Sequence, residues 1–167
     1  MNEATVTIHH DSPVVWFRAV GPHSKDIPVP AYETKDASGM DLRAAAFGAS
    51  SNTFEDYILR PMDRVLVRTG YAIEIPNGYE GQIRTRSGFA LRRGLVVVNA
   101  PGTIDSDFRG EIGVILGNIG KESIKLIRGN RIAQLVIAPV AKALIRTTLV
   151  ALSDTERGEG GFGSTGE

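Results

Sequence analysis

Apolar residues along the chain occur in short runs that are separated by polar, turn-forming residues. The runs are Val14–Val20, Val65–Val67, Tyr71–Ile75, Leu95–Val98, Ile112–Leu116, Ile124–Ile127, Ile132–Ala138 and Ala143–Thr148. Turn signals lie between them, at Pro76-Asn77-Gly78 and at Gly129-Asn130. Short runs bounded by such residues are typical of strands. This spacing predicts an all-β sandwich or barrel of hairpins.

One segment, residues 87–93, has the signals of a helix. Ser87 can cap its start, two arginines fall in its last turn, and Gly94 follows as a stop. The free backbone N–H groups at such a start attract anions, and Arg86 stands immediately before it. We therefore expect one short helix with an anion-binding end.

Four arginines crowd this part of the chain, namely Arg84, Arg86, Arg92 and Arg93. A solvated charged face would account for them, and so would an anion site. Because Arg84 and Arg86 are two residues apart, they share one face of the strand before the helix. Together with the helix start, this arrangement favours a phosphate cradle.

Residues 99–111 carry most of the candidate chemistry. Pro101 and Gly102 fit the central positions of a type II turn, so the apolar runs on either side are predicted to form a hairpin with a long polar tip. In an extended tip Asp105 and Asp107 would point to the same side. Such a pair suits a divalent metal site, a general base with an orienting neighbour, or turn capping.

Composition narrows the class of protein. With 167 residues and 42% hydrophobic content, the chain fits one domain that is large enough to fold without disulfides or a structural metal. It has no cysteine. We expect a cytoplasmic protein, because residues 1–12 lack a secretory signal. Lys plus Arg equals Asp plus Glu at 19 each, so no basic field attracts nucleic acid. No apolar run approaches the roughly 20 residues of a membrane span.

The composition changes from Ser153 onward to a polar, glycine-rich tail. We expect a β domain over residues 1–152 and a mobile arm over 153–167. The tail formally matches GxGxxG, but a dinucleotide fingerprint needs a strand before it and a helix after it. A terminus without a role is one interpretation; in the other, Arg157 clamps a phosphate and Phe162 stacks on a base.

The histidines, His9, His10 and His23, lie apart from all these groups, so no histidine base or metal site is expected.

Five segments in this order resemble the motifs of the homotrimeric dUTP diphosphatases (dUTPases). They are SGMDLRAA at 38–45, RSGFA at 86–90, residues 99–111, GNRIAQL at 129–135 and the arm at 157–166. The resemblance implies a jelly-roll or distorted barrel trimer that hydrolyses dUTP to dUMP and pyrophosphate. Each active site would draw on more than one subunit. Such an activity keeps uracil out of DNA and supplies dUMP for dTTP synthesis.

By this resemblance Asp105 is the general base that deprotonates the water attacking the α-phosphorus, and Asp107 holds the loop. The ring of Phe108, where relatives usually have tyrosine, would pack under the deoxyribose and reject UTP. Uracil would be recognised by the Asn99 amide and by the backbone of Gly102, Thr103 and Ile104.

The resemblance assigns the phosphates to Arg86, Ser87 and Gly88, with Gln134 assisting. Asp41 would reach Mg²⁺ through coordinated waters. In the arm, Arg157 would grip the terminal phosphate and Phe162 would stack on uracil, with Gly163, Ser164 and Thr165 beside them. Two departures from the family pattern are Ser38, usually alanine, and Gly113, often lysine.

Two other functions remain open at this point. A dCTP deaminase shares the fold, but it needs an acid that relays protons at the cytosine ring. A catalytically silent jelly roll would lack the base or the arm. Product analysis separates both from a diphosphatase.

Overall fold

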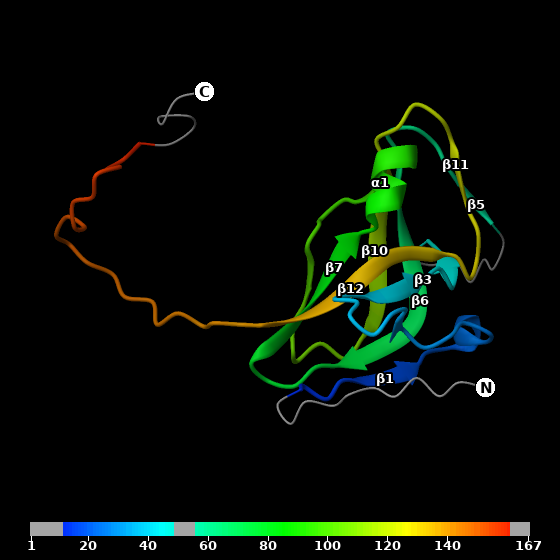
Figure 1. Ribbon diagram of the computed structural model, residues 1–167, viewed down its shortest axis with the longest axis horizontal. Helices are drawn as coiled ribbons and strands as arrows, with labels where there is room; N and C mark the ends of the chain where they lie inside the picture. The colour runs from blue at the N-terminus through cyan, green and yellow to red at the C-terminus, as the bar shows by residue number, and fades with distance from the viewer. Residues whose placement is uncertain (1–11, 49–55, 161–167) are drawn as a thin grey trace.

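The computed structural model describes residues 12–48 and 56–160, and the strands of this part form two five-stranded antiparallel sheets and a two-stranded one (Figure 1). The first sheet has the order β1-β6-β10-β8, with β4 beside β6, and the second has the order β2-β3-β12-β7-β9; β11 pairs with β5. The strands are β1 (Trp16–Ala19), β2 (Ala31–Tyr32), β3 (Met40–Arg43), β4 (Ala46–Phe47), β5 (Tyr57–Leu59), β6 (Arg64–Glu74), β7 (Tyr79–Thr85), β8 (Leu95–Val97), β9 (Gly102–Ile104), β10 (Glu111–Asn118), β11 (Ile124–Leu126) and β12 (Arg131–Pro139).

One core takes its side chains from both large sheets. Val67 and Val114 belong to the first sheet and Leu42 and Leu135 to the second, and all four are fully buried. Within residues 12–48 and 56–160 neither sheet closes on itself. The predicted all-β architecture is therefore confirmed as a sandwich of jelly-roll type, without a closed barrel.

Helix α1 (Ser87–Arg93) and a 3₁₀ turn, η1 (Pro22–Ser24), complete the described structure. The predicted helix is confirmed, and it ends where Gly94 adopts a left-handed conformation with φ +64°. Its predicted cap is wrong: Arg86 is the N-cap residue, Ser87 is already helical, and no side chain caps the start. No helix in the described part of the chain is long and apolar enough to cross a membrane.

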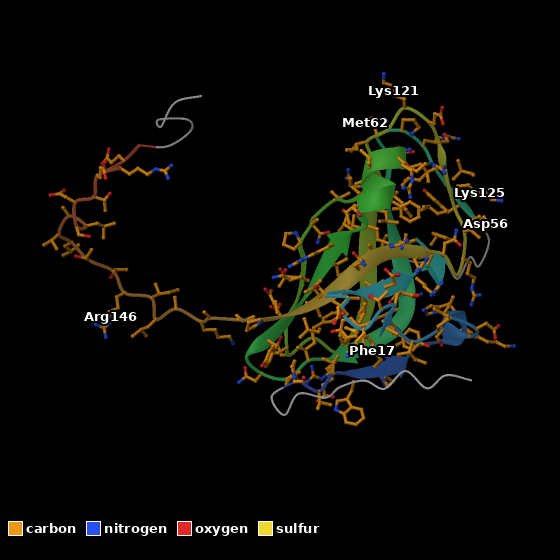
Figure 2. All side chains as sticks on the ribbon, viewed as in Figure 1. Phe17, Asp56, Met62, Lys121, Lys125 and Arg146 are labelled. Carbon is orange, nitrogen blue, oxygen red and sulfur yellow. The ribbon has the colours of Figure 1, made fainter. Side chains whose placement is uncertain are left out.

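The predicted apolar runs lie in or overlap strands, with one exception. The two runs at 65–67 and 71–75 belong to the single long strand β6, which continues through Gly70 at φ +80°. The exception is Ala143–Thr148, where the chain after β12 runs away from the body as an extended segment (Figure 1). Its side chains are exposed, Ile145 to 88%, and Arg146 lies far from every strand (Figure 2). An extended segment becomes a strand only beside a partner strand, so this prediction is wrong for the single chain.

The predicted hairpin of β8 and β10 is confirmed, because Val97 pairs with Leu116. The predicted type II turn at Pro101-Gly102 is wrong. The Ala100–Pro101 peptide is cis, the Ala100 N–H donates to the Val97 carbonyl at 3.2 Å, and Gly102 opens β9 without a positive φ. Pairing of Gly102 with Ile83 of β7 holds this residue in an extended conformation.

Strand β7 is hydrogen-bonded on both edges and sets the positions of the candidate residues. Arg84 pairs with Gln134 of β12, which pairs in turn with Asp41 of β3. On the other edge Ile83 pairs with Gly102 of β9. Because neighbouring residues of a strand point to opposite faces, Ile83 enters the core while Arg84 and Gln134 face outward.

We expect Gly94→Ala to lower the free energy of unfolding by about 3 kcal/mol. An added Cβ would lie 2.6 Å from the Gly120 backbone nitrogen, so a close contact is added to the cost of a left-handed alanine. Gly129→Ala is the matched control, since Gly129 has φ +85° and open space around it. That variant should lose only about 1 kcal/mol. Equal losses for the two variants in urea unfolding would contradict this account.

Candidate active site

Most of the predicted site residues line three separate cavities that share no residue. The β9 cavity, of about 120 Å³, is lined by Ile83, Asn99, Gly102, Thr103, Ile104, Phe108, Ile112 and Gly113. The helix cavity, of about 140 Å³, is lined by Arg86, Ser87, Gly88, Phe89, Arg92 and Gln134. The turn cavity, of about 210 Å³, contains Asp105. The sequence analysis assigned residues of all three cavities to one nucleotide site.

The β9 cavity combines an apolar wall with a free strand edge. Ile83 and Ile104 supply buried side chains, and β9 is the last strand of its sheet in the described structure. The backbone groups on its outer edge can therefore bind a planar ligand, as any unpaired edge can. An added Cβ on Gly102 would lie 3.1 Å from the Asn99 Nδ2 atom, so glycine leaves room for this amide.

Phe108 also lines the β9 cavity and is 41% exposed. Its ring lies over Gly110, where an added Cβ would approach the ring Cζ atom to 2.7 Å. The Phe108 N–H donates to the Asp105 carbonyl at 3.1 Å, so residues 105–108 form a tight turn. The predicted extended conformation of the tip is therefore wrong.

The helix cavity is the candidate anion site. Arg86 and Arg92 supply its positive charge, and the Arg86 guanidinium lies 5.5 Å from the Phe89 ring centroid, which holds it in place. Arg84 does not line this cavity, contrary to the predicted cradle, because its Nη2 donates to the Gln82 Oε1 atom at 2.6 Å. A charged side chain beside exposed backbone N–H groups suits a phosphate.

Asp41 is 5% exposed and lies beside this cavity. Its Oδ1 atom is 3.3 Å from the Arg86 Nε atom, and its Oδ2 atom accepts a hydrogen bond from the Arg131 Nη1 atom at 3.2 Å. Arg131 also lies 3.4 Å from Glu33. The sequence analysis did not predict that Arg131 and Glu33 lie beside Asp41. The two residues are far apart in the sequence, and no motif spacing connects a residue before β3 with the start of β12.

The surroundings of Asp41 fit a metal ion that reaches it through water. Its buried Oδ1 atom has an ion-pair contact with Arg86 but no hydrogen-bond partner among the described residues, so it can accept from a metal-bound water. No group of three or more metal-ligating side chains occurs in the described ranges. Mg²⁺ typically binds one or two carboxylates together with substrate phosphates and retains several waters, so one carboxylate beside an anion site suits it.

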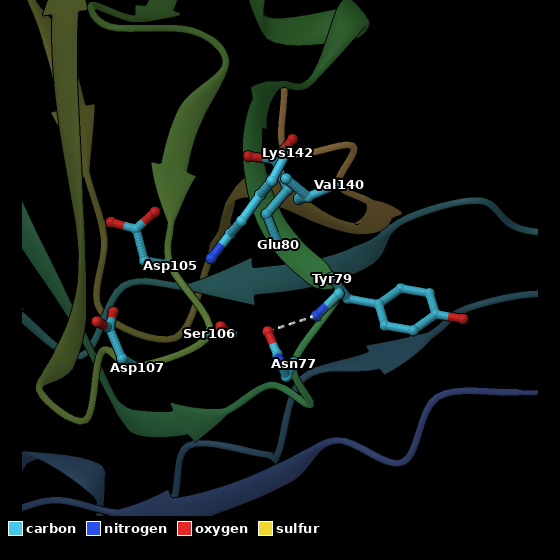
Figure 3. A pocket seen from close by; sticks show the side chains of 9 residues that line it. Asn77, Tyr79, Glu80, Asp105, Ser106, Asp107, Val140 and Lys142 are labelled. Atoms are coloured by element: carbon cyan, nitrogen blue, oxygen red, sulfur yellow. Dashed lines mark hydrogen bonds between the residues drawn. The ribbon is translucent and has the colours of Figure 1, made fainter. Parts of the chain in front are cut away.

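The loop that carries Asp105, Ser106 and Asp107 lines one side of the turn cavity (Figure 3). Asn77 and Gly78 form another wall, and Lys142, from the segment after β12, directs its side chain toward the Asp105 loop (Figure 3). A lone lysine carried no signal that sequence reasoning could have used. Asp105 itself is exposed.

The C-terminal candidates are not brought to any of these cavities. Arg157 lies on the segment that leaves the body, where its Nε donates to the Gly160 carbonyl at 2.8 Å. Phe162, Gly163, Ser164 and Thr165 lie outside the described residues, as do His9 and His10. His23, expected to lie apart, is buried against Glu111, and sequence reasoning missed this pair.

Comparison with known proteins identifies the family. The dUTPase family model matches residues 25–166. A deoxyuridine 5′-triphosphate nucleotidohydrolase of Rhizobium etli is 50% identical over 161 residues, covering 96% of this chain and 99% of its own. Its counterpart in Methylocella silvestris is 53% identical over 145 residues, 87% of each chain. The dUTPase of Staphylococcus bacteriophage 80alpha, solved with dUpNHpp, superposes with a TM-score of 0.77 at 25% identity and covers 92% of this chain and 99% of its own. The chain belongs to the dUTPase family.

We expect Asp41→Asn to destabilise the fold by about 2 kcal/mol. The amide would turn an NH₂ group toward one of two arginines and leave a buried charge pair broken. Asp56→Asn is the control, because its pair with Lys125 at 2.8 Å is exposed. That variant should change the stability by no more than about 0.5 kcal/mol. Indistinguishable urea midpoints for the two variants would contradict the assignment of a buried role to Asp41.

Proposed function

We propose that this chain hydrolyses dUTP to dUMP and pyrophosphate, with Asp105 orienting and deprotonating the water that attacks the α-phosphorus. The observation that carries the proposal is the match, over nearly the whole chain, to relatives named deoxyuridine 5′-triphosphate nucleotidohydrolase. The phage neighbour that binds dUpNHpp shares the fold. In a cell the reaction would keep uracil out of DNA and supply dUMP for dTTP synthesis.

The β9 cavity would hold the nucleoside. The edge of Gly102–Ile104 and the Asn99 amide can donate to and accept from uracil, whereas cytosine presents the opposite pattern and leaves buried groups unpaired. The Phe108 ring would lie against the deoxyribose and exclude a 2′-hydroxyl. These contacts make the site selective for dUTP over dCTP and UTP.

The helix cavity would hold the phosphate chain through Arg86, Ser87, Gly88 and Gln134. Mg²⁺ bound to the triphosphate would be linked to Asp41 through a coordinated water, and the ion would offset the charge of the phosphates. When Arg86 turns toward a phosphate, Asp41 keeps Arg131 as a partner. The carboxylate thus stays neutralised while its Oδ1 atom accepts from water.

The separation of the cavities supports a homotrimer with shared sites. The β9 cavity includes Ile83, which faces the core, and the helix cavity includes Gln134, which faces outward from the same sheet. One nucleotide would therefore take its base contacts from one chain and its phosphate contacts from another. The exposed apolar segment after β12 gives each chain a surface for contacting its neighbours.

We propose that residues 153–167 act as an arm that closes over the bound nucleotide. Arg157 would grip the terminal phosphate and Phe162 would stack on uracil, with Gly163, Ser164 and Thr165 around the phosphates. Closure would exclude all water but the attacking one. We place this activity in the cytoplasm, with dUTP as the ligand and neither nucleic acid nor membrane as a partner.

Pyrophosphate release with Mg²⁺ and each of dUTP, dCTP, dTTP and UTP in parallel tests the function. Release from dUTP alone is the expected result. Ammonia from dCTP would indicate a deaminase, and no reaction with any of the four would indicate a silent jelly roll. Either of these results overturns the proposal.

We expect Asp105→Asn to bind dUpNHpp within a few-fold of the parent and to turn over dUTP about 10²- to 10⁴-fold more slowly, because the amide cannot take the proton of water. Asp107→Asn, in the same turn, should keep most of the activity. The pair is measured by equilibrium binding and single-turnover hydrolysis. Turnover by Asp105→Asn within a few-fold of the parent would remove Asp105 as the base.

We expect removal of residues 154–167 to lower kcat/KM for dUTP about 10²-fold or more, because the closed site is lost. The body should still assemble, so light scattering should give three times the mass of the truncated chain. Full activity in the truncated protein would refute the arm, and a monomeric mass for the full-length chain would refute the trimer.

A further inference from the structure

The Glu111 carboxylate lies at the junction of the Asp105 loop and strand β10, and its side chain is only 11% exposed. We propose that Glu111 is a positioning residue that sets the width of the β9 cavity, and through it the discrimination between deoxyribose and ribose. The inference rests on the proposed function and extends it to a residue that contacts no part of the nucleotide.

All contacts of this carboxylate come from donors. Its Oε1 atom accepts from the Gly70 N–H at 2.8 Å and from the His23 Nε2 atom at 2.6 Å. Its Oε2 atom accepts from the Arg68 Nε and Nη2 atoms at 2.8 and 2.5 Å. Because an ionised carboxylate only accepts, the His23 Nε2–H group is the donor in this contact. A group with any donor of its own would not fit this position.

The carboxylate holds an irregular step between β6 and β10. Glu111 pairs with Ala72 and Gly113 with Arg68, so β6 advances four residues while β10 advances two. The extra length is absorbed at Gly70, with φ +80°, and the Thr69 Oγ1 donates to the Ile112 carbonyl at 2.8 Å. Glu111, the first residue of β10, thus holds the bulge of β6 in place through its hydrogen bonds with Arg68 and Gly70.

This step carries the far wall of the β9 cavity. Ile112 and Gly113 line that wall with Phe108, whose ring packs over Gly110 next to Glu111. The near wall, at Gly102 and Ile104, is held separately by pairing with β7. The distance between the walls therefore depends on how Glu111 seats β10 against β6. A displaced far wall moves the Phe108 ring from the place where a 2′-hydroxyl would lie.

Glu111→Gln tests the inference, because the variant keeps the shape and turns an NH₂ group toward Arg68 or His23. The measured quantity is the ratio of kcat/KM for dUTP to kcat/KM for UTP, which does not depend on the fraction of folded enzyme. We expect this ratio to fall about tenfold, through a higher kcat/KM for UTP, whose 2′-hydroxyl is no longer excluded, together with a higher KM for dUTP from the misplaced wall. Arg68→Gln, which removes the two donors to Oε2, should lower the ratio in the same direction.

Glu74→Gln is the matched control, since Glu74 forms an exposed pair with Arg109 of the same loop at 3.7 Å. Its ratio should stay within about twofold of the parent, as for most surface pairs. An unchanged ratio in Glu111→Gln and Arg68→Gln, or an equal fall in Glu74→Gln, overturns the positioning role. Lack of dUTP hydrolysis by the parent itself would instead overturn the proposed function, so the two failures are distinguishable.

Discussion

Hydrogen bonding of β7 on both of its edges is the constraint on which the candidate site depends. One edge fixes Gln134 and, beyond it, Asp41, and the other edge fixes Gly102 of β9. Since side chains alternate along a strand, this pairing places Gln134, which lines the helix cavity, on the outer face of the sheet. It places Ile83, which lines the β9 cavity, on the core face. A slip of one residue would exchange the two faces and destroy both cavities.

Charge balance is the second theme of the structure. Asp41 is buried beside two arginines, and Glu111 is enclosed by Arg68, His23 and a backbone amide. Buried carboxylates of this kind persist only where donors surround them. Asp105 is different, because it lies in an exposed turn without such partners in the described structure. The buried acids hold the geometry, and the exposed acid remains available to water.

Local patterns in the sequence were sufficient to predict much of this fold. Helix α1 carries its own stop signal at Gly94, and the β8–β10 hairpin follows from its two apolar runs. Features set by distant partners were not predictable in the same way. Gly102 is extended because it pairs with β7, and His23 is buried against Glu111, which lies 88 residues further along the chain. The family resemblance grouped the site residues, but no single-chain pattern shows that they line separate cavities.

The segment after β12 has a consequence for how the protein is made. Leu144, Ile145 and Leu149 project into solvent from a single chain, which favours contact with any apolar surface nearby. In the proposed homotrimer, neighbouring chains would cover these side chains, so a newly synthesised chain would expose them until it assembles. The rate of such assembly would rise with the local concentration of new chains, and low expression would leave more of them exposed to proteolysis.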